Sequence, residues 1–385
     1  MSKVKLGDVA IEHKGTCKGS KDGYPIVGLE HLVPEEVTLT AWDEGSDNTF
    51  TKMFRKGNVL FGRRRAYLKK AAVAPFDGIC SGDITVIEAI PDRILPELLP
   101  FIIQNDELFD FAVVKSAGSL SPRVKWEHLK NYEFELPDMD KQRELAELLW
   151  AMDATKKSYQ KLIAATDELV KSQFMEQFGD PKTNPFSWPV TTVGEICDIK
   201  SGTTLPADKE NEGGEIAYIK VADMNLRGNE KYITTSTKYV SAATAGNGVF
   251  PVGTIVFPKN GAAVATNKKR ITHVPTCVDL NTMGVTPIIE IDEQYLYLWF
   301  QLLDLDSISL VSAIPQISAK TMGAQTIMLP PIELQERFAA FVRQSDKSKF
   351  AALQCCSQSI MPRNDKLYDF LGTYHGSMAI ACMLL

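Results

Sequence analysis

The sequence lacks the features that would place it in a membrane or outside the cell. No apolar run reaches the roughly eighteen residues that a membrane-spanning helix needs. Residues 1–5 are not followed by the apolar core of a signal peptide. The 7 cysteines include no C-x-x-C pair and no histidine at metal-ligand spacing. We therefore expect a cytoplasmic chain with reduced thiols, no membrane contact and no metal site.

Catalytic motifs are missing as well. There is no G-x-x-x-x-G-K-S/T loop, and Gly246-Asn247-Gly248 lacks the third glycine of a dinucleotide loop. Asn184-Pro185-Phe186-Ser187 lacks the second proline and the aromatic position of an amino-methyltransferase loop. Asp198-Ile199-Lys200 and Glu12-His13-Lys14 end like a nuclease site but have no upstream acid to help hold Mg²⁺. We predict no active site and no catalytic residue in this chain.

The sequence does contain a set of short motifs that occurs twice in the same order. Cys80 and Cys277 occupy matching places in apolar runs, which predicts core positions. Two copies of one module, each ending in a helix, favour a bipartite binding protein over an enzyme with a single site. The other recurring pairs are Leu6-Gly7-Asp8-Val9 with Val193-Gly194-Glu195-Ile196, Lys56-Gly57-Asn58-Val59-Leu60-Phe61 with Val252-Gly253-Thr254-Ile255-Val256-Phe257, and Leu136-Pro137 with Leu329-Pro330.

The charge distribution points to DNA although the formal net charge is −6. Residues 51–76 and 231–278, at corresponding places in the two copies, contain no Asp or Glu but many Lys and Arg. A carboxylate near a phosphate weakens binding, so these windows predict DNA-facing surfaces. The sequence does not separate base-reading side chains from phosphate contacts. The candidates are Arg63, Arg64, Arg65, Tyr67, Lys69 and Lys70 in the first copy and Lys259, Asn260, Lys268, Lys269 and Arg270 in the second.

Periodicity predicts two α/β domains with β-rich cores. Short apolar runs at 24–29, 58–61 and 83–87 are separated by Gly, Pro and Asp, as in a mixed, mostly antiparallel sheet. Residues 95–111 have helical spacing, with a counterpart near 295–305. The segments 119–122 and 313–316 are predicted to be exposed turns before a final strand.

A long helix is predicted from Asp138 to Phe178, because no Gly or Pro interrupts this stretch and a heptad seam runs along it. Gly179 and Pro181 end it. At 1.5 Å per residue such a helix is roughly 60 Å long, so it must bridge domains or pair with another helix. A second helix begins at Pro331 in matching phase. The residues predicted for the seam and for partner contact are Leu145, Leu148, Met152, Tyr159, Leu162, Leu169, Phe338 and Phe341.

The order of these features resembles the specificity subunit of type I restriction-modification systems over about residues 3–353. The resemblance rests on the duplicated starts Leu6-Gly7-Asp8 and Val193-Gly194-Glu195, on Leu-Pro before each long helix, and on the join from Phe178 to Pro189. It implies an α+β fold of two tandem target-recognition domains, joined by long helices that form an antiparallel coiled coil. The implied segments are domain 1 (1–136), a spacer helix (137–180), domain 2 (181–329) and a second, truncated spacer helix (330–354).

The resemblance also implies partners. Each domain would read one half of a split, asymmetric site in double-stranded DNA, and the helices would dock two methyltransferase subunits. Restriction and translocation subunits would complete the system, which in this family defends against phage. S-adenosylmethionine, ATP and Mg²⁺ would belong to those partners, and this chain would carry no cofactor. Two alternatives are a fused methyltransferase, for which a cofactor domain is missing, and a tandem adaptor that binds proteins rather than DNA.

The segment 355–385 departs from the expected pattern. The seam fades after Leu353, and Pro362, Gly372 and Gly376 interrupt any helix. Such a tail is typical of a shifted reading frame or a recombined gene end. We expect it to leave part of the first helix, around Tyr159 to Leu169, without a full antiparallel partner.

Overall fold

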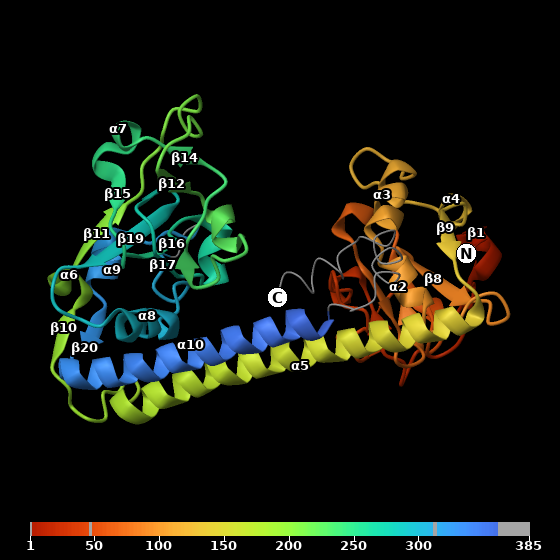
Figure 1. The fold of residues 1–385 in the computed structure, drawn as a ribbon, viewed down its shortest axis with the longest axis horizontal. Coiled ribbons are helices and arrows are strands. Elements are labelled where there is room, and N and C mark those ends of the chain that lie inside the picture. Colours follow the sequence, from red (N-terminus) through yellow and green to blue (C-terminus); the bar gives the residue numbers. More distant parts are fainter. Residues whose placement is uncertain (1, 46–47, 311–313, 361–385) are drawn as a thin grey trace. The chain divides into compact units, whose positions relative to one another are not determined.

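The computed structural model describes residues 2–45, 48–310 and 314–360, and side chains as far as Lys349. The chain forms two compact units (Figure 1). Unit 1 comprises Met1–Ile163 with Phe350–Leu385, and unit 2 comprises Ala164–Lys349. The atypical tail predicted at 355–385 lies outside the described residues from 361 onward.

Unit 1 contains two small sheets and one strand pair. The first sheet is antiparallel throughout and has the order β2 (Ala10–Glu12), β8 (Ile84–Ala89), β5 (Val59–Gly62), β6 (Ala71–Val73). In the second, β7 (Gly78–Cys80) lies between parallel β3 (Ile26–Val27) and antiparallel β4 (Lys52–Phe54). The pair consists of β1 (Ser2–Lys5) and β9 (Glu133–Leu136). The predicted strands and the mostly antiparallel sheet are confirmed.

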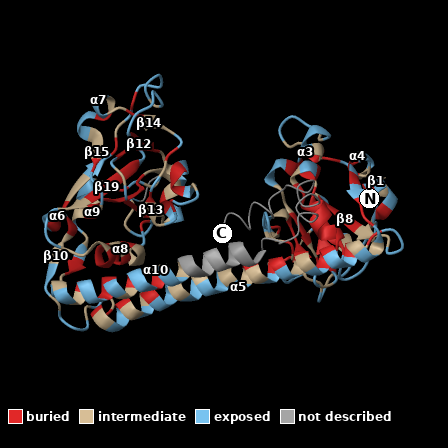
Figure 2. Ribbon diagram, viewed as in Figure 1, coloured by how far each residue is buried: buried red, intermediate tan, exposed pale blue. Residues whose placement is uncertain are grey.

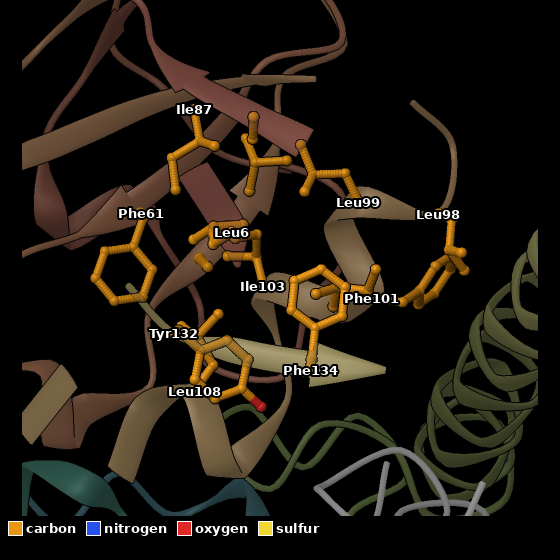
Figure 3. Packing of buried hydrophobic residues seen from close by; sticks show 14 of the residues in the cluster. Leu6, Phe61, Ile87, Leu98, Leu99, Phe101, Ile103, Leu108, Tyr132 and Phe134 are labelled. Carbon is orange, nitrogen blue, oxygen red and sulfur yellow. The ribbon is translucent and has the colours of Figure 1, made fainter. Parts of the chain in front are cut away.

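Helices cover one face of the first sheet and close the core of unit 1. Figure 3 shows Phe61 and Ile87 of this sheet together with Leu108 and Tyr132. Strand β5 is buried on both faces: Val59 and Phe61 belong to this core and Leu60 to the neighbouring one. The helices are α1 (Leu6–Val9), α2 (Leu99–Ile103), α3 (Asp106–Val114) and α4 (Trp126–Leu129), with short turns η1 (Leu29–His31) and η2 (Ala66–Leu68).

The helix predicted at 95–111 is broken into α2 and α3, which corrects the prediction. Asn105 lies between them with extended backbone, and its side chain accepts a hydrogen bond from the amide of Glu107. This is an N-cap, so a new helix starts there. Gln104 also turns away from a helical path, and its side chain donates to the carbonyls of Glu36 and Ala71.

Unit 2 repeats this plan with larger sheets. The five-stranded sheet has the order β11 (Cys197–Ser201), β19 (Thr282–Pro287), β16 (Ile255–Pro258), β17 (Arg270–Thr272), β13 (Tyr232–Ile233). The four-stranded sheet has the order β14 (Tyr239–Val240), β12 (Ile216–Ile219), β18 (Thr276–Val278), β15 (Val249–Phe250). A last pair joins β10 (Val190–Thr192) to β20 (Thr326–Met328). The helices and turns are α6 (Val193–Ile196), α7 (Ala242–Ala245), α8 (Glu293–Leu302), α9 (Ala319–Gly323), η3 (Val221–Asn225), η4 (Gly246–Gly248) and η5 (Gly261–Thr266).

The duplication seen in the sequence is present in the packing. Ile255 and Phe257 of β16 face one core and Val256 faces another, as do the residues of β5. Cys80 and Cys277 are fully buried in β7 and β18, as predicted. Burial raises the pKa of the Cys80 thiol to about 12 and that of Cys277 to about 11, which makes both thiols unreactive.

The long helices are α5 (Met139–Phe178) and α10 (Ile332–Ile360). The predicted span of the first is confirmed, whereas the second runs past the predicted boundary at 354. Gly179 ends α5 with a φ of +82°, and a Cβ there would lie 2.5 Å from the Pro185 ring. Only glycine fits this left-handed, crowded position.

A buried glutamine fixes the start of each long helix to the domain before it. Gln142 donates to the Pro137 carbonyl at 2.8 Å and accepts from the Leu95 amide at 2.8 Å. Gln335 donates to the Pro330 carbonyl at 2.8 Å and accepts from the Asp292 amide at 3.0 Å. Each side-chain amide therefore satisfies two backbone groups that would otherwise be buried unpaired.

Within unit 2, the end of α5 pairs antiparallel with α10. Phe178 contacts Phe338 near the start of α10, with ring centroids 5.4 Å apart. Asp167, further back along α5, forms an ion pair with Lys349, further along α10. The chain direction of this pairing agrees with the predicted antiparallel arrangement.

The predicted seam on α5 needs a correction of phase. Figure 2 shows the alternation of buried and exposed positions along this helix. Leu145 and Met152 are buried as predicted, but Leu162 and Leu169 are each 50% exposed. The second buried column lies one residue later than predicted, at Leu149, Lys156 and Val170. A stripe that faces a globular core is wider than a strict coiled-coil seam and includes the i+4 positions. Tyr159 and Leu148 are half-buried beside unit 1's core.

Among the described residues, no helix combines the length and the apolar character needed to cross a bilayer.

Candidate nucleic-acid interface

The same backbone frame recurs at one end of the main sheet in each unit. In unit 1, two backbone amides of the loop between β5 and β6 donate hydrogen bonds. The Arg63 amide donates to the Asp83 carbonyl at 3.0 Å, and the Arg65 amide donates to the Pro122 carbonyl at 2.8 Å. In unit 2, the backbone amides of the loop between β16 and β17 donate in the same way. The Lys259 amide donates to the Asn281 carbonyl and the Gly261 amide to the Pro315 carbonyl, both at 2.8 Å. We call this arrangement the loop frame.

A third chain segment completes the loop frame. Arg64 forms an isolated β-bridge with Arg123, and Asn260 forms the corresponding bridge with Gln316. Arg123 also bridges back to Ala117, as Gln316 does to Leu310. The predicted turn at 119–122 is the tip of this segment in unit 1 and is exposed, with Leu120 90% accessible. The two units thus present equivalent positions with different side chains.

In unit 1, the loop frame holds a charged group that we call the first polar cluster: Arg64, Asp83, Ser121 and Arg123. Arg123 donates from Nε to one Asp83 oxygen at 2.6 Å and from Nη2 to the other at 3.2 Å. Arg64 donates from Nε to Ser121 Oγ at 2.7 Å, and its Nη1 lies 3.5 Å from Asp83. The Arg123 hydrogen bond, with further help from Arg64 and Arg63, lowers the pKa of Asp83.

In unit 2, the same positions carry neutral amides, which we call the second polar cluster: Asn260, Asn281 and Gln316. Asn260 Nδ2 lies 3.4 Å from Asn281 Oδ1, and Asn281 donates to Asp279 at 3.1 Å. Asn260 Oδ1 is buried and accepts no hydrogen bond within the described structure. Gln316 is exposed.

The structure brings the six first-copy candidates onto this one loop, around turn η2. Arg65 and Tyr67 are exposed. Arg65 and Lys69 have left-handed backbone, with φ of 53° and 50°, and enclose the turn between them. Lys69 forms a 2.5 Å ion pair with Asp106, and Lys70 donates to the Leu29 carbonyl at 2.7 Å. These lysines hold the loop in place and are partly committed to protein partners.

The second-copy candidates are less accessible than the sequence predicts. Lys269 has no exposed surface, and its ammonium donates to Asn267 and to the Leu303 carbonyl, both at 2.6 Å. Lys259 is 8% exposed and donates to Ser201. Arg270 donates to the carbonyls of Lys269 and Met224, and burial lowers its pKa. The prediction of Lys269 as a surface contact is wrong, because its charge is satisfied inside the fold.

In the folded chain, carboxylates from other segments lie close to the two windows that contain no Asp or Glu in the sequence. Asp83 and Asp106, both outside residues 51–76, approach the basic loop of unit 1. In unit 2, Lys231 pairs with Asp346 at 2.6 Å, and Lys238 pairs with Glu210. Several cations in the windows therefore have carboxylate partners from distant segments.

Sequence reasoning missed Arg123, Asp83, Asn281 and Gln316. A signal was available, since the predicted turns at 119–122, directly before Arg123, and at 313–316, which includes Gln316, recur before the last strand of each copy. Their side chains, however, do not match, and the pairing across the loop frame involves long sequence separations. The pairing of Arg64 with Arg123 and of Asn260 with Gln316 therefore could not be predicted from one sequence.

One group of metal-ligand type occurs in the described part of the chain: Glu30, His31 and Asp43. Its carboxylates are exposed; His31 Nδ1 accepts from the Gly28 amide at 2.9 Å, and Nε2 lies 3.5 Å from Asp43 Oδ1. Exposed acidic groups commonly gather without an ion, so this group supports no metal centre.

Replacing Lys269 by Met should change the pH dependence of stability. Burial lowers the pKa of Lys269 to about 8. Between about pH 8 and 10.5 the unfolded chain binds more protons at this residue, so the free energy of unfolding rises with pH. We expect wild-type protein to gain up to about 3 kcal/mol relative to Lys269→Met from pH 7 to pH 10. Lys268→Met is the matched control, and chemical denaturation at each pH is the measurement. A constant wild-type-to-Lys269→Met difference would contradict the prediction.

Comparison with known families matches the chain in two segments. A family model described as "Type I restriction modification DNA specificity domain" matches residues 1–165 and again residues 185–354. The fold and this duplicated match define a protein with two DNA specificity domains. The chain belongs to the type I restriction-modification specificity family. The resemblance inferred from the sequence is thereby confirmed.

Solved structures share the fold. The type I restriction-modification S subunit from M. genitalium is 16% identical with a TM-score of 0.53, covering 97% of this chain and 95% of that one. A chain from a structure described as the complex assembly and conformational transition of the type I R-M system is 20% identical with a TM-score of 0.50, covering 99% and 97%. At such identities the likeness shows a common architecture of two tandem domains with long helices.

Proposed function

We propose that this chain is the DNA-recognition subunit of a type I restriction-modification complex and reads a bipartite, asymmetric site. The observation that carries the proposal is the loop frame, which occurs once in each unit and displays different polar side chains in each. The loop frames of the two units would act as two independent DNA-recognition surfaces, here called reading heads. Two such surfaces on one chain fit a target with two unlike halves. Affinity would come from phosphate contacts by exposed cations such as Arg65, and sequence choice from groups that reach base edges.

The chemistry is proposed to belong to partners. The described residues contain no catalytic motif of the kinds sought in the sequence, and the matched family is a recognition domain. The proposed partners are two methyltransferase subunits, which would supply S-adenosylmethionine chemistry, and restriction or translocation subunits, which would use ATP and Mg²⁺. The exposed side chains of Leu162 and Leu169 on α5 are candidates for contacts with such subunits.

Mapping of methylated adenines tests the proposal. The chain is expressed with the methyltransferase subunit of the same system in a host that lacks adenine methylation. We expect methylation at one split sequence, and none when either subunit is expressed alone. Methyl transfer by the isolated chain would contradict the non-catalytic role.

The adaptor alternative makes a different forecast. A DNA-binding complex must lose affinity steeply as salt rises, because phosphate contacts release counterions. A protein adaptor would show no such DNA affinity. Titration of a labelled duplex at two salt concentrations separates these functions.

A heptad inserted into α5 after Tyr159 should change the gap between half-sites or abolish binding. Seven residues add about 10 Å of helix, equivalent to about three base pairs of duplex. The bases within each half-site should not change. Seven residues inserted at Gly213, in an exposed loop of unit 2, are the control. Methylation mapping that returns the original gap for the Tyr159 insertion would contradict a spacer role for α5.

A further inference from the structure

We infer that Arg123 and Gln316 are equivalent base-reading residues, with Arg123 selecting guanine in one half-site and Gln316 selecting adenine in the other. The inference deepens the proposed function and rests on it. It assigns specificity to one matched position of the loop frame in each unit. Neither residue belongs to the basic windows that first suggested DNA binding.

The geometry of the first polar cluster presents Arg123 for recognition. Asp83 accepts hydrogen bonds from its Nε and Nη2, at 2.6 and 3.2 Å, and so fixes the plane of the guanidinium. The remaining Nη1–Nη2 edge has only a 3.4 Å contact with the Ser121 carbonyl. The side chain is still 40% exposed. An oriented guanidinium with one edge available suits the two acceptors of guanine, O6 and N7.

Arg64 reinforces this arrangement from the loop between β5 and β6. Its Nε is held by Ser121, and no described residue accepts from its Nη2. The cluster contains two guanidinium groups and one carboxylate, so it keeps a net positive charge. Such a cluster attracts the duplex as well as orienting Arg123.

The second polar cluster has the same backbone and no net charge among its three matched residues. Gln316 replaces Arg123, Asn281 replaces Asp83 and Asn260 replaces Arg64, at bridges and hydrogen bonds that correspond one to one. Gln316 is exposed, and its side-chain amide makes no hydrogen bond to the described residues. A side-chain amide places an N–H donor beside a carbonyl acceptor, which matches the N7 acceptor and the N6 donor of adenine.

The pair of clusters therefore differs in reading chemistry, whereas the frame that positions them is unchanged. If these side chains only stabilised the loop frame, the same ionic group would serve in both units. Instead, all three charged residues of unit 1 correspond to amides in unit 2. Asn281 donates to Asp279 at 3.1 Å, so this member of the amide cluster is also held in place. We expect the two half-sites to differ, at the base pair facing this position, by guanine against adenine.

Exchange of the clusters tests the inference. The variant Arg123→Gln with Asp83→Asn places amides at two matched positions of unit 1, and Gln316→Arg places a guanidinium at the matched position of unit 2. Each is assembled with the methyltransferase subunit and used to select duplexes from a randomised library. We expect a preference change of at least about tenfold from guanine to adenine at one pair of the first half-site. Gln316→Arg should produce the reverse change in the second half-site only.

Arg93→Gln is the matched control, because Arg93 is exposed in unit 1 beyond the other end of β8 from Asp83. It should leave both half-sites unchanged. If either cluster variant binds more weakly on all sequences with no change of preferred base, the residue is a phosphate contact and the inference is wrong. If the first variant fails to fold, as judged by its melting temperature, Gln316→Arg decides alone, since Gln316 is exposed. If the wild-type complex enriches no split sequence, the proposed function fails instead.

Discussion

Exchanging residues 1–160 for those of a relative with a different target should change one half-site completely and leave the other as it is. The junction lies beyond Met152 because Leu145, Leu149 and Met152 of α5 belong to the core of unit 1. A junction at 136 would separate these side chains from the sheet that they cover. Each unit buries its own core, so the second reading head keeps its structure.

Methylation mapping of the hybrid complex measures this result. The reciprocal hybrid, with residues 161–349 exchanged, is the control and should change the second half-site alone. A hybrid in which both half-sites change together would contradict separate reading heads. Loss of all methylation together with a lowered melting temperature would show that the junction, rather than recognition, is at fault, and a junction elsewhere in 157–165 would then be used.

Phe338→Ala should remove about 3–5 kcal/mol from the free energy of unfolding of unit 2, the usual cost of truncating a fully buried aromatic side chain. Phe338 is 0% exposed. Its ring lies 5.7 Å from that of Phe174 and 5.4 Å from that of Phe178, while Phe174 stacks on Tyr295 of α8. The truncation therefore leaves a cavity where α5, α8 and α10 meet.

Phe341→Ala is the matched control, because Phe341 is only half-buried on the same helix. Its loss should be clearly smaller. Chemical denaturation followed by tryptophan fluorescence reports on this region, since Trp299 belongs to the same core. Equal losses for the two variants would mean that the junction of the three helices is not the centre of this core.

The sequence predicted the features that depend on local pattern. The repeat, the span of α5 and the strand around Phe61 follow from periodicity, and glycine at Gly179 marks a helix end whatever the tertiary context. The fold's features that depend on distant partners were not predictable in this way. The phase of the buried stripe on α5 is set by the cores that it covers, and Leu162 and Leu149 are equally apolar in the sequence.

In the candidate site, too, the local pattern was predictable and the contacts between distant segments were not. A run such as Arg63-Arg64-Arg65 is visible, but the carboxylate that orients a neighbouring guanidinium comes from Asp83 and the guanidinium itself from Arg123. Lys269 looked like Lys268 in the sequence, yet one is enclosed by the end of α8 and the other is partly exposed. Burial of a lysine depends on which carbonyls the fold brings to it, and no local rule states that.

The buried glutamines Gln142 and Gln335 give this single asymmetric chain a form of quasi-equivalence. Each locks the start of a long helix to its own domain through the same two hydrogen bonds. The two helix starts are therefore held in the same local geometry, although the surrounding sequences have diverged. Local equivalence of this kind requires no symmetry axis within the chain.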